Sequence, residues 1–153
     1  MLRLLLLTLP LAILAGDVLE CRHPYINIGE RCIYMDPWQV GTMAEVRAIC
    51  KTHGGDLIWF DSDTDCDFYR ELIETIRNNP TQVKDYWIGV TDEGHEDNWK
   101  YMKNNVAVRN GPPFWYQGYP KVSAVANCAY LRKTYYYWFS TACTNKFATL
   151  CRK

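Results

Sequence analysis

Seven cysteines constrain the fold of this 153-residue chain more than any other feature of its sequence. The shortest interval between two of them runs from Cys143 to Cys151, so the closely spaced pairs of a structural zinc site are missing. Disulfides are the alternative, and an odd number leaves at least one cysteine unpaired. Spacing alone leaves the pairing open. The seven are Cys21, Cys32, Cys50, Cys66, Cys128, Cys143 and Cys151.

The N-terminus indicates the compartment in which disulfides would form. Arg3 supplies one positive charge, and an apolar stretch from Leu4 to Ala15 follows it. That stretch is short for a membrane-spanning helix but has the length of a signal peptide, with cleavage expected after Gly16. An N-terminal membrane anchor is the alternative. We therefore expect residues 1–16 to be a signal peptide and residues 17–153 to form one secreted, extracellular domain whose disulfides persist.

Composition and charge exclude several classes of function. With 48% hydrophobic and 14% aromatic residues, the chain is expected to fold rather than to stay disordered. Its 17 basic and 17 acidic residues leave no basic excess, so we expect no nucleic-acid partner. No apolar run after residue 16 is long enough to span a membrane, so no membrane partner is expected once the signal peptide is cleaved. His23, His53 and His95 accompany no catalytic motif, and we expect no enzymatic activity.

The residue pattern predicts a short hairpin, then two helices, and then further strands. Thr42 and Glu45 form a capping box that begins a helix ending near Gly54, and a second helix follows Ser62 and stops before Pro80. Short runs of aromatic or β-branched residues predict the strands. A long segment, 104–127, has no sustained period. The predicted class is α+β with a small, mostly antiparallel sheet. The predicted strands cover 25–28, 31–34, 86–90, 99–102, 128–131, 136–139 and 147–151.

Several motifs occur in an order that resembles the C-type lectin-like domain family over nearly all of residues 17–153. They are Gly54-Gly55-Asp56-Leu57, Trp87-Ile88-Gly89, Trp99-Lys100-Tyr101, Tyr119-Pro120 and Trp138, set among the cysteines. The resemblance implies a disulfide-stapled fold with a long loop, and core positions for Trp87, Ile88, Val90 and Trp99. It also implies the disulfide pairs Cys21–Cys32, Cys50–Cys151 and Cys128–Cys143.

The calcium-dependent sugar site of that family is where the sequence departs from the resemblance. Sugar-binding members coordinate calcium with side-chain oxygens, because this ion takes six to eight hard oxygen ligands. The corresponding positions here are Tyr119-Pro120-Lys121, Ala126 and Phe139-Ser140, which together offer two hydroxyls and no carboxylate or carboxamide. We expect calcium-coordinated sugar binding to be lost and no cofactor to be required.

An accessory calcium site of some relatives is only half matched. Its acids correspond here to Asp92, Glu96, Val122 and Asn127, so two of the four are carboxylates. Asp92 and Glu96 are weak candidates for metal ligands, and the interpretation that they only order a loop is favoured. No metal is expected.

Aromatic and basic residues concentrate in and after the long segment. They could stack on a sugar and bind glycans or a microbial surface without metal, or they could form an interface with a protein ligand. A role in an extracellular or mineral matrix is a third alternative. Since the resemblance implies recognition, we expect a function in innate immunity. The candidate ligand-binding residues are Trp115, Tyr116, Tyr119, Pro120, Lys121, Tyr135, Phe139 and Ser140.

Cys66 is the cysteine that the implied pairing leaves over. It lies at the start of the second predicted helix, between Asp65 and Asp67, where we expect it to be exposed. An exposed thiol in a secreted protein favours an interchain bond, hence a disulfide-linked homodimer. A free, unreacted thiol is the alternative.

Overall fold

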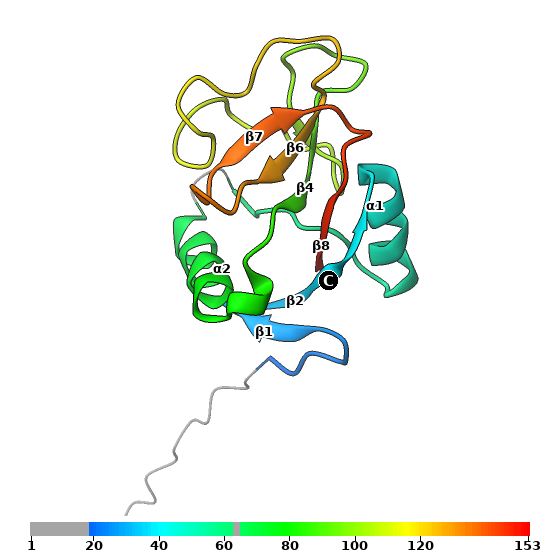
Figure 1. Ribbon diagram of the computed structural model, residues 1–153, viewed down its shortest axis with the longest axis vertical. Coiled ribbons are helices and arrows are strands. Elements are labelled where there is room, and N and C mark those ends of the chain that lie inside the picture. Colours follow the sequence, from blue (N-terminus) through cyan, green and yellow to red (C-terminus); the bar gives the residue numbers. More distant parts are fainter. Residues whose placement is uncertain (1–18, 63–64) are drawn as a thin grey trace, which may run out of the picture.

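The computed structural model describes residues 19–62 and 65–153 (Figure 1). The predicted signal peptide lies outside the described residues. Two helices and an eight-stranded mixed sheet form an α+β fold, as predicted. The elements are β1 (Ile26–Ile28), β2 (Arg31–Gly41), α1 (Met43–Thr52), β3 (Asp56–Leu57), α2 (Cys66–Asn78), the 3-10 helix η1 (Pro80–Gln82), β4 (Tyr86–Thr91), β5 (Lys100–Tyr101), β6 (Cys128–Leu131), β7 (Trp138–Thr141) and β8 (Phe147–Arg152).

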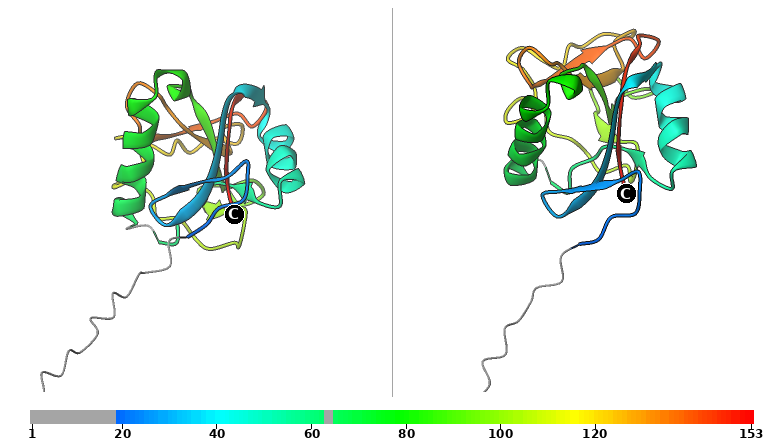
Figure 2. Two further views of the ribbon diagram at one scale, coloured as in Figure 1. Left: turned by 90° about the horizontal axis from the view of Figure 1, so that it is seen from below. Right: turned by 60° about the horizontal axis from the view of Figure 1, so that its bottom comes forward.

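The sheet is built around the antiparallel pair β2 and β8. Its strand order is β1-β2-β8-β4-β6-β7, with β3 paired to β8 and β5 paired to β4. The contact between β4 and β8 is the one parallel pair among the described strands, so the sheet is mostly antiparallel. Helices α1 and α2 lie on opposite sides of β2 and β8 (Figure 2). The C-terminal strand therefore lies in the middle of the fold.

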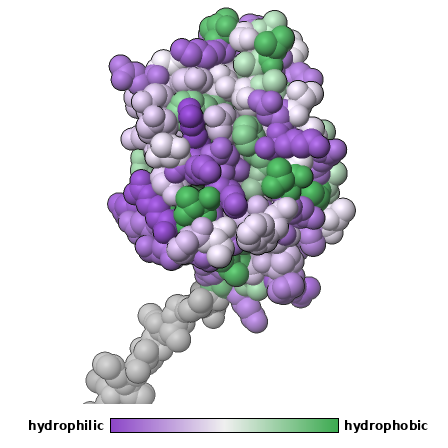
Figure 3. Space-filling view, viewed as in Figure 1, coloured by the Kyte–Doolittle hydropathy of each residue, from purple (hydrophilic) through white to green (hydrophobic). Residues whose placement is uncertain are grey.

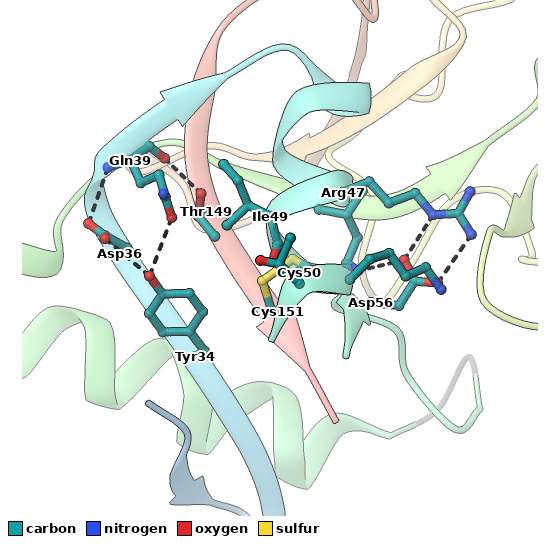
Figure 4. Close-up of a disulfide and its surroundings, with 12 residues drawn as sticks. Tyr34, Asp36, Gln39, Arg47, Ile49, Cys50, Asp56, Thr149 and Cys151 are labelled. Carbon is teal, nitrogen blue, oxygen red and sulfur yellow. Dashed lines mark hydrogen bonds and ion pairs between the residues drawn. A yellow bond between two sulfur atoms is a disulfide. The ribbon is translucent and has the colours of Figure 1, made fainter. Parts of the chain in front are cut away.

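Helix α1 begins where the capping box predicts. The Thr42 hydroxyl accepts a hydrogen bond from the Glu45 N–H, and the Glu45 carboxylate accepts one from the Thr42 N–H at 2.8 Å. The helix buries Met43, Val46 and Cys50. Cys50 is bonded to Cys151 of β8 (Figure 4), and this disulfide fastens the helix to the central strand.

An ion pair between α1 and β3 supports the same packing. Asp56 is 0% exposed, yet Arg47 Nε lies 2.9 Å from its Oδ1 and Lys51 Nζ lies 2.7 Å from its Oδ2 (Figure 4). Burial raises the pKa of Asp56, but hydrogen bonds from Arg47, Lys51 and the Leu57 N–H outweigh it, so the pKa lies below its usual value. The buried carboxylate therefore stays charged and paired.

All three disulfide pairs implied by the resemblance are confirmed: Cys21–Cys32, Cys50–Cys151 and Cys128–Cys143. Cys66 is exposed in the first turn of α2, as expected, and has no disulfide partner within the described chain. The core positions predicted for Trp87, Ile88, Val90 and Trp99 are also confirmed, since all four are buried.

Strands β2 and β7 differ from their predicted limits by two residues or more, and the short strand β3 was not predicted. Strand β7 begins at Trp138 rather than at residue 136, because Tyr136 has a positive φ of 57° and belongs to the preceding turn. Strand β2 extends to Gly41, well beyond the predicted end at residue 34, with a register shift against β8 between Asp36 and Val40. The Pro37 in this segment conceals the strand in the sequence. Among the described residues, no helix is long and apolar enough to cross a membrane.

Candidate functional site: an aromatic surface on the long loop

The long loop between β5 and β6 is fastened to the edge strand β7. The Trp138 N–H donates to the Phe114 carbonyl at 2.8 Å, and the Tyr116 N–H donates to the Trp138 carbonyl at 3.0 Å. The buried ring of Phe114 stacks on that of Trp138, with centroids 4.8 Å apart. The loop is therefore held both by backbone bonds and by core packing, and Tyr116 has a fixed position beside β7.

Three tyrosines pack around the buried ring of Phe139 next to this attachment, and a fourth packs on one of the three. We call Tyr116, Tyr119, Tyr135 and Tyr137 the tyrosine surface. Tyr116 stacks on Phe139 and on Tyr135, with a centroid distance of 4.9 Å in each case. Tyr119 meets Phe139 edge-on at 4.5 Å, and Tyr137 lies 6.1 Å from Tyr116. Tyr135 and Tyr137 are each 43% exposed, so ring surface remains open to a ligand.

Two cations border the tyrosine surface. Lys121 Nζ lies 4.9 Å from the ring centroid of Tyr119, and Arg132 Cζ lies 5.5 Å from that of Tyr135. Neither side chain has an ion pair with a described acid, and both lie within the range of a cation–π contact. The surface can therefore offer apolar ring faces and hydrogen-bond donors together.

The structure places some of the predicted ligand-binding residues elsewhere. Trp115 is 2% exposed and Phe139 is 3% exposed, so neither ring has a face free to stack on a ligand. This corrects their prediction as direct contacts, because Phe139 supports the tyrosine surface from below and Trp115 packs against Trp99 and Trp138. Ser140 is buried too, and its Oγ accepts a hydrogen bond from the Lys121 N–H at 2.8 Å. The structure does bring four of the predicted residues together, namely Tyr116, Tyr119, Lys121 and Tyr135. Pro120 is partly exposed beside them.

A cavity of about 530 Å³ opens next to the tyrosine surface. Its volume is in the range of ligand-binding pockets. Trp115 forms part of its wall, although little of the ring is exposed. Sequence reasoning did not single out the two prolines of this cavity, for which the run Gly111-Pro112-Pro113 was the available signal. The lining residues are Gly111, Pro112, Pro113, Trp115, Tyr116, Gln117, Gly118 and Tyr137.

The residues at the position of the family's sugar site do not fit calcium. The side-chain oxygens there are two hydroxyls: Ser140 Oγ already accepts the Lys121 N–H, and the Tyr119 ring that carries the other lies against the Lys121 ammonium. Phe139 is buried where a carboxamide or carboxylate would be needed. Since calcium needs six to eight oxygens, no step of ligand binding is assigned to a metal here.

The accessory calcium position also lacks enough oxygen ligands, since only two of its four residues are acids. Asp92 Oδ2 accepts the Asp97 N–H at 2.9 Å, and Glu96 Oε1 accepts the Ser123 N–H at 2.6 Å, so both carboxylates order the loop. Burial raises the pKa of Asp92 above its usual value, and the charges of Glu96 and Asp97 add to the shift. Across residues 19–62 and 65–153, no three His, Cys, Asp or Glu side chains are grouped so that they could hold a metal ion.

A model of the C-type lectin domain family matches residues 39–153. The chain therefore belongs to the C-type lectin domain family, whose members are generally not enzymes and are often extracellular. A search of curated protein sequences found no match.

Solved structures share the fold at low sequence identity. The mouse scavenger receptor C-type lectin carbohydrate-recognition domain is similar with a TM-score of 0.71 and 19% identity, over 88% of this chain and 98% of that one. A calcium-independent type II antifreeze protein has a TM-score of 0.73 and 18% identity, over 90% of this chain and 97% of that one. The carbohydrate-recognition domain of cow CD23, solved in the presence of an oligosaccharide, has a TM-score of 0.70 and 20% identity, over 88% of this chain and 95% of that one.

Proposed function

We propose that this protein is a secreted recognition protein of innate immunity whose tyrosine surface binds glycans of microbial surfaces without calcium. The observation that carries the proposal is the stack of half-buried Tyr116 and exposed Tyr135 over Phe139, at a position where the calcium ligands of sugar-binding relatives are replaced. Aromatic rings offer apolar faces to the C–H groups of a sugar, and the Lys121 and Arg132 side chains can donate hydrogen bonds to its hydroxyls.

Substitutions on the tyrosine surface test this proposal. Tyr135→Ala and Tyr137→Ala should each weaken binding to a glycan array and to heat-killed bacteria and yeast by about threefold to tenfold, the scale of one aromatic contact. Both rings are 43% exposed, so the fold should tolerate their removal. Tyr135→Phe and Tyr137→Phe are the matched controls, because they keep the ring and lose only the hydroxyl.

A protein partner is the competing function, because exposed tyrosine with arginine is also typical of protein interfaces. If the wild-type protein binds no glycan and no microbial cell, while Tyr135→Ala abolishes capture of a host protein, the carbohydrate proposal is wrong. Equal glycan binding by the Ala and Phe variants would also contradict it, since the ring faces would then contribute nothing.

Cys66 supports a proposal about assembly. The thiol is exposed at the first residue of α2, with no cysteine partner in the described chain. We expect a disulfide-linked homodimer. Its two tyrosine surfaces could bind the same microbial surface at once, which raises a weak glycan affinity by multivalency. The oxidised protein should run at twice its monomer mass on a non-reducing gel and at monomer mass after reduction or in Cys66→Ser. Wild-type protein that migrates as a monomer without reductant would rule out the covalent dimer.

A further inference from the structure

A second groove, separate from the tyrosine surface, lies where β2 bends beside β8. Its volume is about 380 Å³, and it shares no lining residue with the tyrosine surface. Three lysines from different segments border it, together with the most exposed tryptophan of the chain. We call it the lysine groove. It is lined by Pro37, Trp38, Val40, Lys84, Asp85, Lys133, Lys146, Phe147 and Ala148.

The backbone under Trp38 is fixed by a polar network. Asp36 Oδ1 accepts the N–H groups of Trp38 at 2.9 Å and Gln39 at 3.1 Å, and Asp36 Oδ2 accepts the Tyr34 hydroxyl. The Gln39 carbonyl accepts the Thr149 hydroxyl of β8 at 2.7 Å. Figure 4 shows Asp36 and Gln39 joined to these neighbours. The bulge therefore holds its shape while the Trp38 side chain stays 75% exposed.

The cations of the lysine groove form no salt bridge with a described acid, although the charge of Lys146 acts on Glu45 at longer range. Lys84 Nζ lies 5.1 Å from the Trp38 ring centroid, and among the described residues none of the three lysines has an ion pair. The nearby acids are already bonded to the backbone: Asp85 Oδ1 accepts the Lys133 N–H at 2.7 Å, and Glu45 accepts the Thr42 N–H. The groove thus carries a net positive charge, with three lysines against the one lining carboxylate of Asp85, beside an open aromatic ring.

We propose that the lysine groove binds a sulfated polysaccharide. A sugar ring would stack on Trp38, and its sulfate groups would pair with the ammonium groups of Lys84, Lys133 and Lys146. The concave shape favours this occupant over a lipid surface, because membrane insertion needs an apolar face that protrudes. On the face shown in Figure 3, strongly hydrophobic residues occur as separate small groups among polar ones, and no broad membrane-binding face is visible there.

Dextran sulfate is the probe, with uncharged dextran of equal length as the ligand control. The wild-type protein should bind dextran sulfate and not dextran, with affinity that falls as salt rises, because exposed charges are screened. The double variant Lys133→Gln/Lys146→Gln should lose about tenfold in affinity, and Trp38→Ala should lose about threefold to tenfold. Dextran sulfate should also protect Trp38 from acrylamide quenching of its fluorescence.

Lys103→Gln is the matched control variant, because Lys103 Nζ also lies 5.1 Å from a tryptophan ring, that of Trp59, outside the groove. It should bind like the wild type. Equal losses in Lys103→Gln and in the double variant would overturn the proposal, since general charge would explain the binding. No binding to dextran sulfate would overturn it too, and Trp38-dependent binding to phosphatidylserine vesicles would then assign the groove to membranes. Because the two surfaces are tested by different variants and probes, either proposal can fail alone.

Discussion

Replacing Cys50 and Cys151 together with alanine is expected to lower the free energy of unfolding by about 4.7 kcal/mol, as the chain-entropy model gives for a loop near 100 residues. The two cysteines are 101 positions apart and join α1 to the central strand β8. Without the bond, the unfolded chain regains the freedom of nearly the whole domain. Guanidinium titration of residues 17–153, followed by tryptophan fluorescence, measures the change.

The double variant Cys128→Ala/Cys143→Ala is the matched comparison. Its cysteines are 15 positions apart, for which the same model gives about 3 kcal/mol. The larger loss of unfolding free energy should therefore follow removal of the disulfide that closes the longer loop. A loss from Cys50→Ala/Cys151→Ala that is no greater than that of the shorter bridge would contradict the view that this bond stabilises the fold by closing the chain on itself.

Phe114→Ala is expected to cost about 3–5 kcal/mol, as removal of a buried phenylalanine does. The Phe114 ring stacks on that of Trp138, and its centroid lies 5.1 Å from the ring centroid of Phe60 and 5.0 Å from that of Tyr69. Its carbonyl also accepts the Trp138 N–H, so the cavity would loosen the attachment of the long loop to β7. Denaturant titration gives the loss of stability, and faster hydrogen exchange of the Tyr116 amide reports the loosened loop.

Phe114→Leu provides the control for volume. It keeps most of the apolar contact and should cost less than about 1.5 kcal/mol, with the Tyr116 amide still protected. If Phe114→Ala destabilised the domain while glycan binding stayed unchanged, the long loop would not need its anchor for recognition. The role given to the tyrosine surface would then be wrong.

Much of the fold is predictable because its determinants are local or covalent. The reciprocal hydrogen bonds of Thr42 and Glu45 start α1 whatever packs against it, and the family motifs around Trp87 and Trp138 imply the disulfide pairs that the structure contains. The limits of β2 could not be predicted. Its second half depends on pairing with β8 across a bulge at Pro37, and a partner more than 100 residues away gives no local pattern.

The candidate sites were less predictable for a physical reason. A run of aromatic residues does not show which rings face inward, and adjacent residues differ in burial. Trp115 is buried while Tyr116 stacks at the surface, and Phe139 is buried beneath Tyr116. The lysine groove was missed because its cations come from three distant segments. Only the folded sheet brings Lys84, Lys133 and Lys146 around Trp38.

The measurement that tests the central claim most directly is a glycan array probed with the oxidised protein in millimolar calcium and again in chelator. Recognition by the tyrosine surface requires binding to survive in chelator, because Ser140 Oγ accepts the Lys121 N–H and the site holds no carboxylate that could bind calcium. Binding that disappears in chelator would contradict the account. It would indicate a metal site elsewhere, and Asp92→Asn and Glu96→Gln would then be the first variants to make.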